Sequence, residues 1–345
     1  MNKYDEYFNF RLACADDTDS IMRFIGDEWK KDHILSKSRE LFLWQHGNSE
    51  YGDEETINIY LMTDKKGSIV GINGFVQYSN DPLKRYISSC ITKVKADLPV
   101  PMCGVELVKR FKRDVPANAY YSSGTSEKMI PIGKKIFNYT VGLMQQYYIL
   151  NPTVKSFKIA GINGDLPDLP FENGSVKLEK ADFSDVLSKY DFNKKFYDQA
   201  YKSPEFIEKR YFRHPVYTYN AYGVVTGNGT YGGVILGREI EAEGSKVFRI
   251  VDYLGDTGLL GEIGGELREL AENQQYEYVD ITAGTLPGDI MKRSGFRLLR
   301  QGDDNIIPMH FEPFEKKNVF VRFQKSSSDI IVFKADGDQD RPNFM

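Results

Sequence analysis

One order of local patterns occurs twice in this chain of 345 residues, and this repeat constrains the fold more than any other feature. Residues 120–142 read YYSSGTSEKMIPIGKKIFNYTVG, and residues 278–299 read YVDITAGTLPGDIMKRSGFRLL. Each segment indicates a strand, a Gly-Thr turn, a helix with paired basic residues, and a further strand. A hairpin, a strand, a loop and a helix precede each segment. We therefore interpret the chain as an internal duplication.

Length and turn residues predict where the two copies lie. A chain of 345 residues fits two domains. Residues 151–190 are rich in Gly and Pro, so we predict a connecting segment there. The expected domains are residues 1–150 and 191–345. Each is expected to be an α/β (α+β) domain with a mixed, mostly antiparallel sheet flanked by helices. The apolar run at residues 330–333 leads into the C-terminal tail, which we expect to pack back onto the body.

Composition excludes several classes of protein. The formal net charge is -4 and basic residues are spread along the chain, so a nucleic-acid partner is not expected. No window has the roughly 18 apolar residues of a membrane span, and the N-terminus lacks a signal-peptide pattern. Three distant cysteines, Cys14, Cys90 and Cys103, favour a reducing compartment. We expect a cytoplasmic protein without a metal site, since CxxC and HExxH spacings are absent.

The order of elements in each half resembles a domain of the GNAT superfamily of acyl-CoA N-acyltransferases. Residues 10–47, 219–256 and 333–343 are similar to a group of bacterial tandem GNAT proteins associated with surface-polysaccharide and amino-sugar biosynthesis. The resemblance implies an N-acyltransferase that takes acetyl-CoA or a longer acyl-CoA. The acceptor it implies is an amine, with a nucleotide-linked amino sugar favoured. Whether the chain forms a homodimer is left open.

Two loops are candidates for the acyl-CoA pyrophosphate, which GNAT folds bind at a helix N-terminus. The first loop precedes a helix expected at residues 105–113, and Lys109, Arg110 and Lys112 follow within two turns. The second loop contains more glycine, but Asp256 and Glu262 would repel a pyrophosphate. Neither loop has the complete family pattern. We favour the first half. The candidate binding residues in the two loops are Met102, Cys103, Gly104, Val105, Gly258 and Gly261.

The acid and base of the transfer are less apparent from the sequence. GNAT domains commonly place a Tyr in the last helix, where Gly133 and Met291 align here, and neither can donate a proton. An amine acceptor needs a base near neutral pKa. The candidate bases are His33, His46, Glu40 and Asp252. Each His could instead cap a helix or lie on the surface, and Asp252 could instead be the partner of Arg249.

The tail residues Asp336, Asp338, Asp340 and Arg341 are candidates for contact with the acceptor. Their D-x-D-x-D spacing resembles the start of a calcium loop. Arg341-Pro342 follows, and no Glu reaches the twelfth position, so we reject calcium binding.

Two other functions fit the same fold. One is an aminoacyl transferase for cell-wall peptides, which would need a basic surface for tRNA. The other is a non-catalytic binding protein, because both loops and both Tyr positions depart from the GNAT pattern. Fold alone does not separate these functions from acyl transfer.

Overall fold

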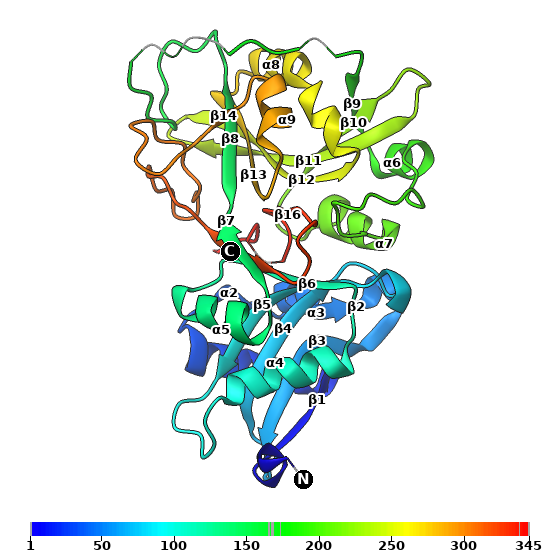
Figure 1. The fold of residues 1–345 in the computed structure, drawn as a ribbon, viewed down its shortest axis with the longest axis vertical. Coiled ribbons are helices and arrows are strands. Elements are labelled where there is room, and N and C mark those ends of the chain that lie inside the picture. The colour runs from blue at the N-terminus through cyan, green and yellow to red at the C-terminus, as the bar shows by residue number, and fades with distance from the viewer. Residues whose placement is uncertain (1, 165, 167–168, 173, 338, 344–345) are drawn as a thin grey trace.

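The computed structural model describes residues 2–164, 166, 169–172, 174–337 and 339–343. It contains two eight-stranded sheets that lie one beyond the other along the long axis of the molecule, each with helices packed against it (Figure 1). The first half of the chain forms most of the lower sheet in this view, and the second half forms most of the upper sheet. No helix within these ranges is long and apolar enough to cross a membrane.

The first sheet has the strand order β1-β3-β4-β5-β6-β15-β7, and the short β2 pairs with β3. Its strands are β1 Phe8–Cys14, β2 Gly47–Asn48, β3 Asp53–Asp64, β4 Ile69–Gln77, β5 Tyr86–Val94, β6 Ala119–Ser123, β7 Thr140–Leu143 and β15 Arg322–Lys325. Its helices are α1 Thr18–Phe24, α2 Ile34–Lys37, α3 Arg39–His46, α4 Cys103–Asp114 and α5 Ile130–Ile136. Alternation along β3 explains the layers. Ile59 and Leu61 pack with α1 and α3, whereas Tyr60 and Met62 pack with α4.

The second sheet has the order β14-β8-β13-β12-β11-β10-β9, and β16 pairs with β13. Its strands are β8 Gln145–Leu150, β9 Lys177–Ala181, β10 Asn220–Val225, β11 Tyr231–Ala242, β12 Ser245–Gly255, β13 Tyr278–Gly284, β14 Arg297–Leu298 and β16 Val332–Phe333. Its helices are α6 Phe183–Lys189, α7 Pro204–Ile207, α8 Gly264–Gln274 and α9 Gly288–Arg293. Leu267 and Ala271 of α8 pack against Ile250 and Val279 of the sheet.

The two sheets are built alike. Starting from β1 and from β9, each has three antiparallel pairs, then one parallel pair, then two antiparallel pairs. In each sheet the sixth strand comes from the other half of the chain: β15 enters the first sheet and β8 the second (Figure 1). The shared order confirms the duplication that the repeat predicts. The exact limits of the two domains stay a prediction.

The single parallel pair of each sheet separates before its strands end. β5 and β6 pair only as far as Ser88 and Tyr121, and β12 and β13 only as far as Ile250 and Ile281. A β-bulge lies just beyond, at Cys90 in β5 and at Val251 in β12. We call the separating residues 89–94 and 122–123 the first divergence, and residues 251–255 and 282–284 the second divergence. A bulge beside a separating pair re-aims backbone groups, which is common next to active sites.

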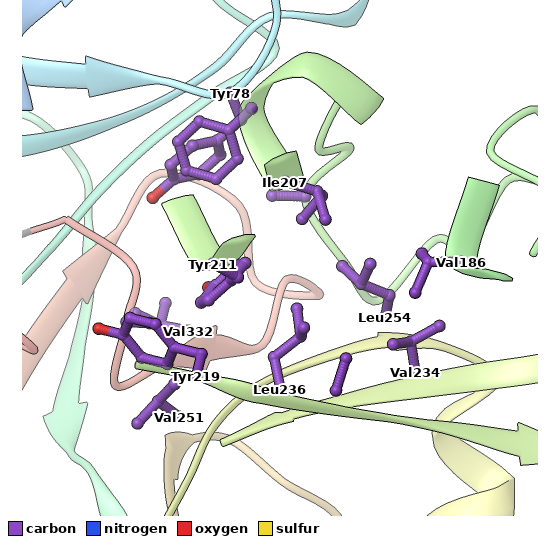
Figure 2. Close-up of a cluster of buried hydrophobic side chains, with 14 of the residues drawn as sticks. Tyr78, Val186, Ile207, Tyr211, Tyr219, Val234, Leu236, Val251, Leu254 and Val332 are labelled. Carbon is purple, nitrogen blue, oxygen red and sulfur yellow. The ribbon is translucent and has the colours of Figure 1, made fainter. Parts of the chain in front are cut away.

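A buried cluster of side chains joins the two halves (Figure 2). It includes Tyr78 just after β4, Tyr211 and Leu236 of the second half, and Val332 of the C-terminal segment, all at most 3% exposed. Because one core contains residues from both sheets and from the C-terminal segment, the two halves form one folded unit.

Two features differ from the sequence analysis. The further strand expected after the helix of the first repeat is two strands, because Met144 divides residues 140–150 into β7 and β8, which belong to different sheets. The Met144 N–H donates to Val321 O at 2.8 Å, and its side chain is 3% exposed, so this crossing point is itself buried. The expected connecting segment also contains β9, the first strand of the second sheet.

Candidate functional site

The first divergence is open to solvent near the start of α4. Thr92 of β5 and Gly124, just after β6, are exposed. Met102 has a left-handed φ of 64°, is 52% exposed, and turns the chain into α4. Its carbonyl accepts the N–H groups of Val105 and Glu106. A Cβ at Gly104 would lie 3.8 Å from Val94, so the Gly104 backbone is not crowded. This helix N-terminus therefore offers backbone N–H groups and a favourable dipole to an anion.

Most charges along α4 are already paired. Glu106 accepts from Arg110 at 2.8 Å, and Arg110 also pairs with Asp5 at 2.7 Å. Lys112 donates to the Tyr139 hydroxyl at 3.1 Å. Lys109 is exposed and forms no ion pair among the described residues. Of the three basic residues that the sequence suggested for the pyrophosphate, Lys109 is thus the one whose charge is not already engaged within the protein.

The equivalent loop of the second half is closed by packing. The Gly258 N–H donates to Asp256 Oδ1 at 2.9 Å, so this amide is already used. A Cβ at Gly261 would lie 2.8 Å from the Arg293 guanidinium. At the start of α8, a Cβ on Gly264 would lie 2.3 Å from Ser294 O, next to the end of α9. These glycines permit close packing between the helices, and that packing covers the N-terminus of α8.

The C-terminal segment of the chain occupies the second divergence. β16 pairs with β13, and the Lys334 N–H donates to Thr282 O at 3.0 Å. On the other side, the Ala335 N–H donates to Val251 O, at the bulge, at 2.9 Å. The segment thus bridges the two separated strands with main-chain hydrogen bonds. The apolar side chain of Phe333, which belongs to the same segment, is 2% exposed.

His33 and His46 are both buried, at 4% and 0% exposure. The Leu35 N–H donates to His33 Nδ1 at 3.2 Å, so the neutral ring carries its proton on Nε2, which is buried without a hydrogen-bond partner among the described residues. His46 Nδ1 lies 3.2 Å from Phe75 O and must donate to it, which leaves Nε2 to accept from Gln45 at 3.1 Å. Neither ring keeps a free lone pair, so the geometry does not favour either as the general base.

Burial also weakens both rings as bases. Burial, followed by the positive charges of Arg341 and Lys30, lowers the pKa of His33 to about 3. Burial also lowers the pKa of His46 to about 4, and Lys209 and Arg341 contribute. Arg341 therefore lies close enough to influence both rings. Arg341 of the tail is thus among the positive charges that lower the pKa of both rings, and both rings are neutral near pH 7.

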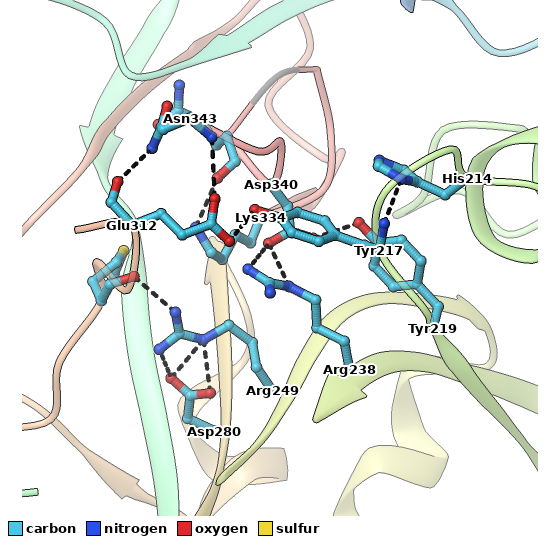
Figure 3. Close-up of polar contacts among 12 residues, drawn as sticks. His214, Tyr217, Tyr219, Arg238, Arg249, Asp280, Glu312, Lys334, Asp340 and Asn343 are labelled. Carbon is cyan, nitrogen blue, oxygen red and sulfur yellow. Dashed lines mark hydrogen bonds and ion pairs between the residues drawn. The ribbon is translucent and has the colours of Figure 1, made fainter. Parts of the chain in front are cut away.

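The two carboxylate candidates lie in different surroundings. Glu40 is exposed and lines a pocket of about 500 Å³ between α3 and the π-helical turn Glu208–Phe212. Asp252 is fully buried, with Lys202 Nζ at 2.5 Å and the Tyr211 hydroxyl at 2.5 Å. Its expected partner Arg249 instead pairs with Asp280 at 2.7 Å (Figure 3). The alternative that Asp252 is the partner of Arg249 was wrong, because Arg249 lies directly opposite Asp280 in the parallel β12–β13 pair.

The tail residues are largely committed to the protein interior. Asp336 is 1% exposed, pairs with Lys202 at 2.9 Å and accepts the Phe333 N–H at 2.7 Å. Burial, opposed by Lys202, raises its pKa to about 6. Asp340, 2% exposed, accepts from the Tyr219 hydroxyl at 2.7 Å and pairs with Arg238 at 3.3 Å (Figure 3). Asp338 lies outside the described residues. Asp336 and Asp340 thus hold the tail in place.

Sequence reasoning missed the basic residues that surround this tail. Three of them are at least 94% buried, namely Lys202, Arg210 and Lys334. Burial lowers the pKa of Lys334 to about 8. A Lys in a short irregular segment such as AYKSPEF has no periodicity that marks it as buried. The two buried tail carboxylates were the available signal, because a buried charge requires a partner.

Comparison with known proteins supports the fold. No family model and no curated protein sequence matches the chain. A GCN5-related N-acetyltransferase from Anabaena variabilis is similar in structure, with a TM-score of 0.56 and 9% identity over 92% of this chain and 72% of that one. A conserved protein of unknown function from Enterococcus faecalis, described as a probable N-acyltransferase, has a TM-score of 0.51 and 11% identity over 84% and 70%. The chain has the fold of the GNAT N-acyltransferases, present in two copies.

Proposed function

We propose that the chain is an acyl-CoA-dependent N-acyltransferase whose donor site is the first divergence. The observation that carries this proposal is an asymmetry between two equal frameworks. Both halves have a separating parallel pair and a bulge, but among the described residues the C-terminal segment bridges only the second divergence with main-chain hydrogen bonds. At the first divergence the tail contributes a side-chain contact, in which Ser123 Oγ donates to Asp336 O at 3.1 Å. The first divergence is exposed at Thr92, and a Cβ at Gly104 of the neighbouring α4 would lie no closer than 3.8 Å to Val94, so this helix N-terminus is not crowded.

In this proposal the pyrophosphate binds the backbone N–H groups at the start of α4, and Lys109 adds a positive charge. The thioester oxygen accepts from backbone N–H groups near the Cys90 bulge, where negative charge develops during attack. The acceptor nitrogen forms the new bond to the acyl carbon and loses one proton, the C–S bond breaks, and the CoA thiolate takes up a proton from water. Orientation of the two substrates supplies much of the rate.

The acceptor proposed is an amine, with a nucleotide-linked amino sugar of surface-polysaccharide biosynthesis favoured by the resemblance. His33 Nε2–H is a buried donor without a partner among the described residues, and Arg341 lies near it. We assign these two side chains to orienting the acceptor. With His33 and His46 lacking a free lone pair, the amine proton leaves through water. A cytoplasmic location follows from the use of acyl-CoA.

The test is acyl transfer measured as release of free CoA thiol in Gly104→Asp and Gly104→Ala variants. A Cβ fits at this position, so Gly104→Ala should keep its KM for acetyl-CoA within about twofold. Gly104→Asp places a negative charge at the pyrophosphate site and should raise that KM at least about a hundredfold, while Asp in a first helical turn does not harm folding. Equal KM values for the two variants would contradict the proposed donor site.

A non-catalytic binding protein is the second candidate function. It is favoured by Gly133, where a GNAT domain commonly has a proton-donating Tyr; here a Cβ would lie 2.5 Å from Gln324 Oε1. Such a protein would bind acetyl-CoA, and Gly104→Asp would weaken that binding. It would release no CoA thiol with any amine. Transfer to any amine above the rate without protein would exclude this candidate.

A further inference from the structure

A pocket of about 490 Å³ lies between the two halves, apart from the first divergence. One side is formed by the loop between β4 and β5 of the first half, with Leu83 and Lys84. The other side is formed by residues 190–202, which connect α6 to α7 in the second half. We propose that this pocket binds a nucleotide: an anion of the nucleoside-diphosphate class, with its base against the aromatic wall and its phosphates against lysines.

The wall of the pocket is rich in aromatic side chains. Tyr190, Phe192 and Phe196 are half-buried in it, and Tyr197 stands at its edge with 89% exposure. Leu83 faces the pocket from the first half with 85% exposure. Tyr197 and Leu83 are the two most exposed large apolar side chains identified in the described part of the chain, and both line this pocket. A flat apolar group between them would be stacked and partly shielded from water.

The charge of the lining is positive. Lys84, Lys194 and Lys195 form no ion pair among the described residues. Asp81 is the one acidic residue in the lining, and its Oδ1 already accepts the Leu83 N–H at 2.9 Å. Lys84 Nζ lies 4.9 Å from the centre of the Tyr201 ring, and Lys194 Nζ lies 5.1 Å from that of Phe196. Cations held beside aromatic faces suit a ligand that combines a base with phosphate.

The inner end of the pocket leads toward the tail. Lys202 lines it and pairs with Asp336, and the following residue, Gly337, lies against β5, where a Cβ would be 2.6 Å from Ser88 Oγ. Ser88 is two residues from the Cys90 bulge. A nucleotide here would lie on the far side of the tail from the donor site. The pocket would thus add a second binding site to the proposed acyltransferase. Its assignment rests on that proposed function only for the identity of the group that the nucleotide carries.

The test is calorimetric binding of uridine 5′-diphosphate and adenosine 5′-diphosphate to the full chain, with uridine and inorganic pyrophosphate as partial probes. We expect a diphosphate nucleotide to bind, and each partial probe to bind at least tenfold more weakly, because each offers only part of the recognised chemistry. Lys194→Glu/Lys195→Glu and Tyr197→Ala should each weaken binding at least tenfold. Lys134→Glu/Lys135→Glu, an equal charge change on exposed residues of α5, should leave it unchanged. Absence of binding, or equal affinity in all variants, would overturn the proposal.

A second arm separates two sources of the nucleotide, since CoA itself carries one. Titration of uridine 5′-diphosphate in the presence of saturating acetyl-CoA should give the same affinity as titration without it. Competition between the two would assign the pocket to the CoA nucleotide and overturn a separate site. A titration of acetyl-CoA alone reports on the donor site, so failure of the nucleotide pocket is distinguishable from failure of the donor site.

Discussion

The first and second divergences have the same strand order, the same parallel pair and the same bulge, yet their contents differ. At the position after the bulge, the first half has Ile91 opposite Gly74, and the second half has Asp252 opposite Leu236. Ile91 joins an ordinary apolar core, whereas Asp252 belongs to a buried cluster with Lys202 and Asp336 that anchors the C-terminal segment. The two copies therefore share one arrangement of strands, but in the second copy the residue at this position holds the C-terminal segment in place.

The loops between the first two helices of each half show the same kind of specialisation. In the first half this loop is short and ends at His33, which caps α2. In the second half the corresponding residues 190–203 are longer and form one side of the pocket between the halves. Equivalent positions thus border the proposed acceptor contact in one copy and the proposed nucleotide pocket in the other.

The largest expected effect follows from removing the buried cation of the second half. Lys202→Met leaves Asp252 and Asp336 without their shared partner, and we expect a loss of about 3–5 kcal/mol in the free energy of unfolding, measured by urea denaturation. Lys189→Met, which breaks the more exposed pair with Glu179, should change the free energy of unfolding much less, because water screens an exposed ion pair. Lys202→Met/Asp252→Asn should recover part of the loss. A loss below about 1 kcal/mol in Lys202→Met would show that this cluster does not distinguish the halves.

A similar but smaller loss is expected where the exchanged strand joins both halves. The Phe323 ring of β15 is 2% exposed and packs against Gly142 and Gly284, at which a Cβ would lie 2.8 and 2.7 Å from it. Phe323→Ala should cost about 3–4 kcal/mol, and unfolding should remain one transition by fluorescence and circular dichroism. Leu187→Ala, at a side chain 52% exposed, is the control and should change stability little. Two separate transitions in Phe323→Ala would mean that the halves are independent.

The next effect concerns the buried histidines of the first half. The pKa of His46 is lowered to about 4 by burial, so protonation favours the unfolded chain, and stability is lost as pH falls from about 6.5 toward 4. The contribution of His46 to this loss of unfolding free energy is on the order of 3 kcal/mol. In His46→Gln, the decrease in unfolding free energy between pH 7 and pH 4 should be smaller by about that amount. An identical pH profile in the variant and the parent chain would contradict the buried neutral ring.

The repeat in the sequence was sufficient to predict the two copies and their shared order, because Gly124-Thr125 and Gly284-Thr285 mark the same turn after the same strand. The exchange of β8 and β15 could not be predicted. Residues 140–150 have one continuous strand pattern, and no local signal shows that the chain changes sheets at Met144.

The candidate site could be predicted only in part. The choice of the loop before α4 as the donor site came from the resemblance and stays a prediction, whereas the apolar run at residues 330–333 marked the C-terminal segment that the structure buries. The occupation of the second divergence by residues 332–335 depends on main-chain hydrogen bonds to Thr282 and Val251. Main-chain pairing leaves little trace in side-chain identity, so no sequence pattern marked it.

The most direct test of the difference between the halves is hydrogen–deuterium exchange with and without acetyl-CoA. If the first divergence is the donor site, acetyl-CoA should slow exchange of the backbone N–H groups at residues 89–94 and 102–106. Residues 251–255 and 256–264, the equivalent positions of the second half, should exchange at unchanged rates. Protection of the second set without the first would contradict the account, because it would place the acyl-CoA in the half whose divergence the chain already fills.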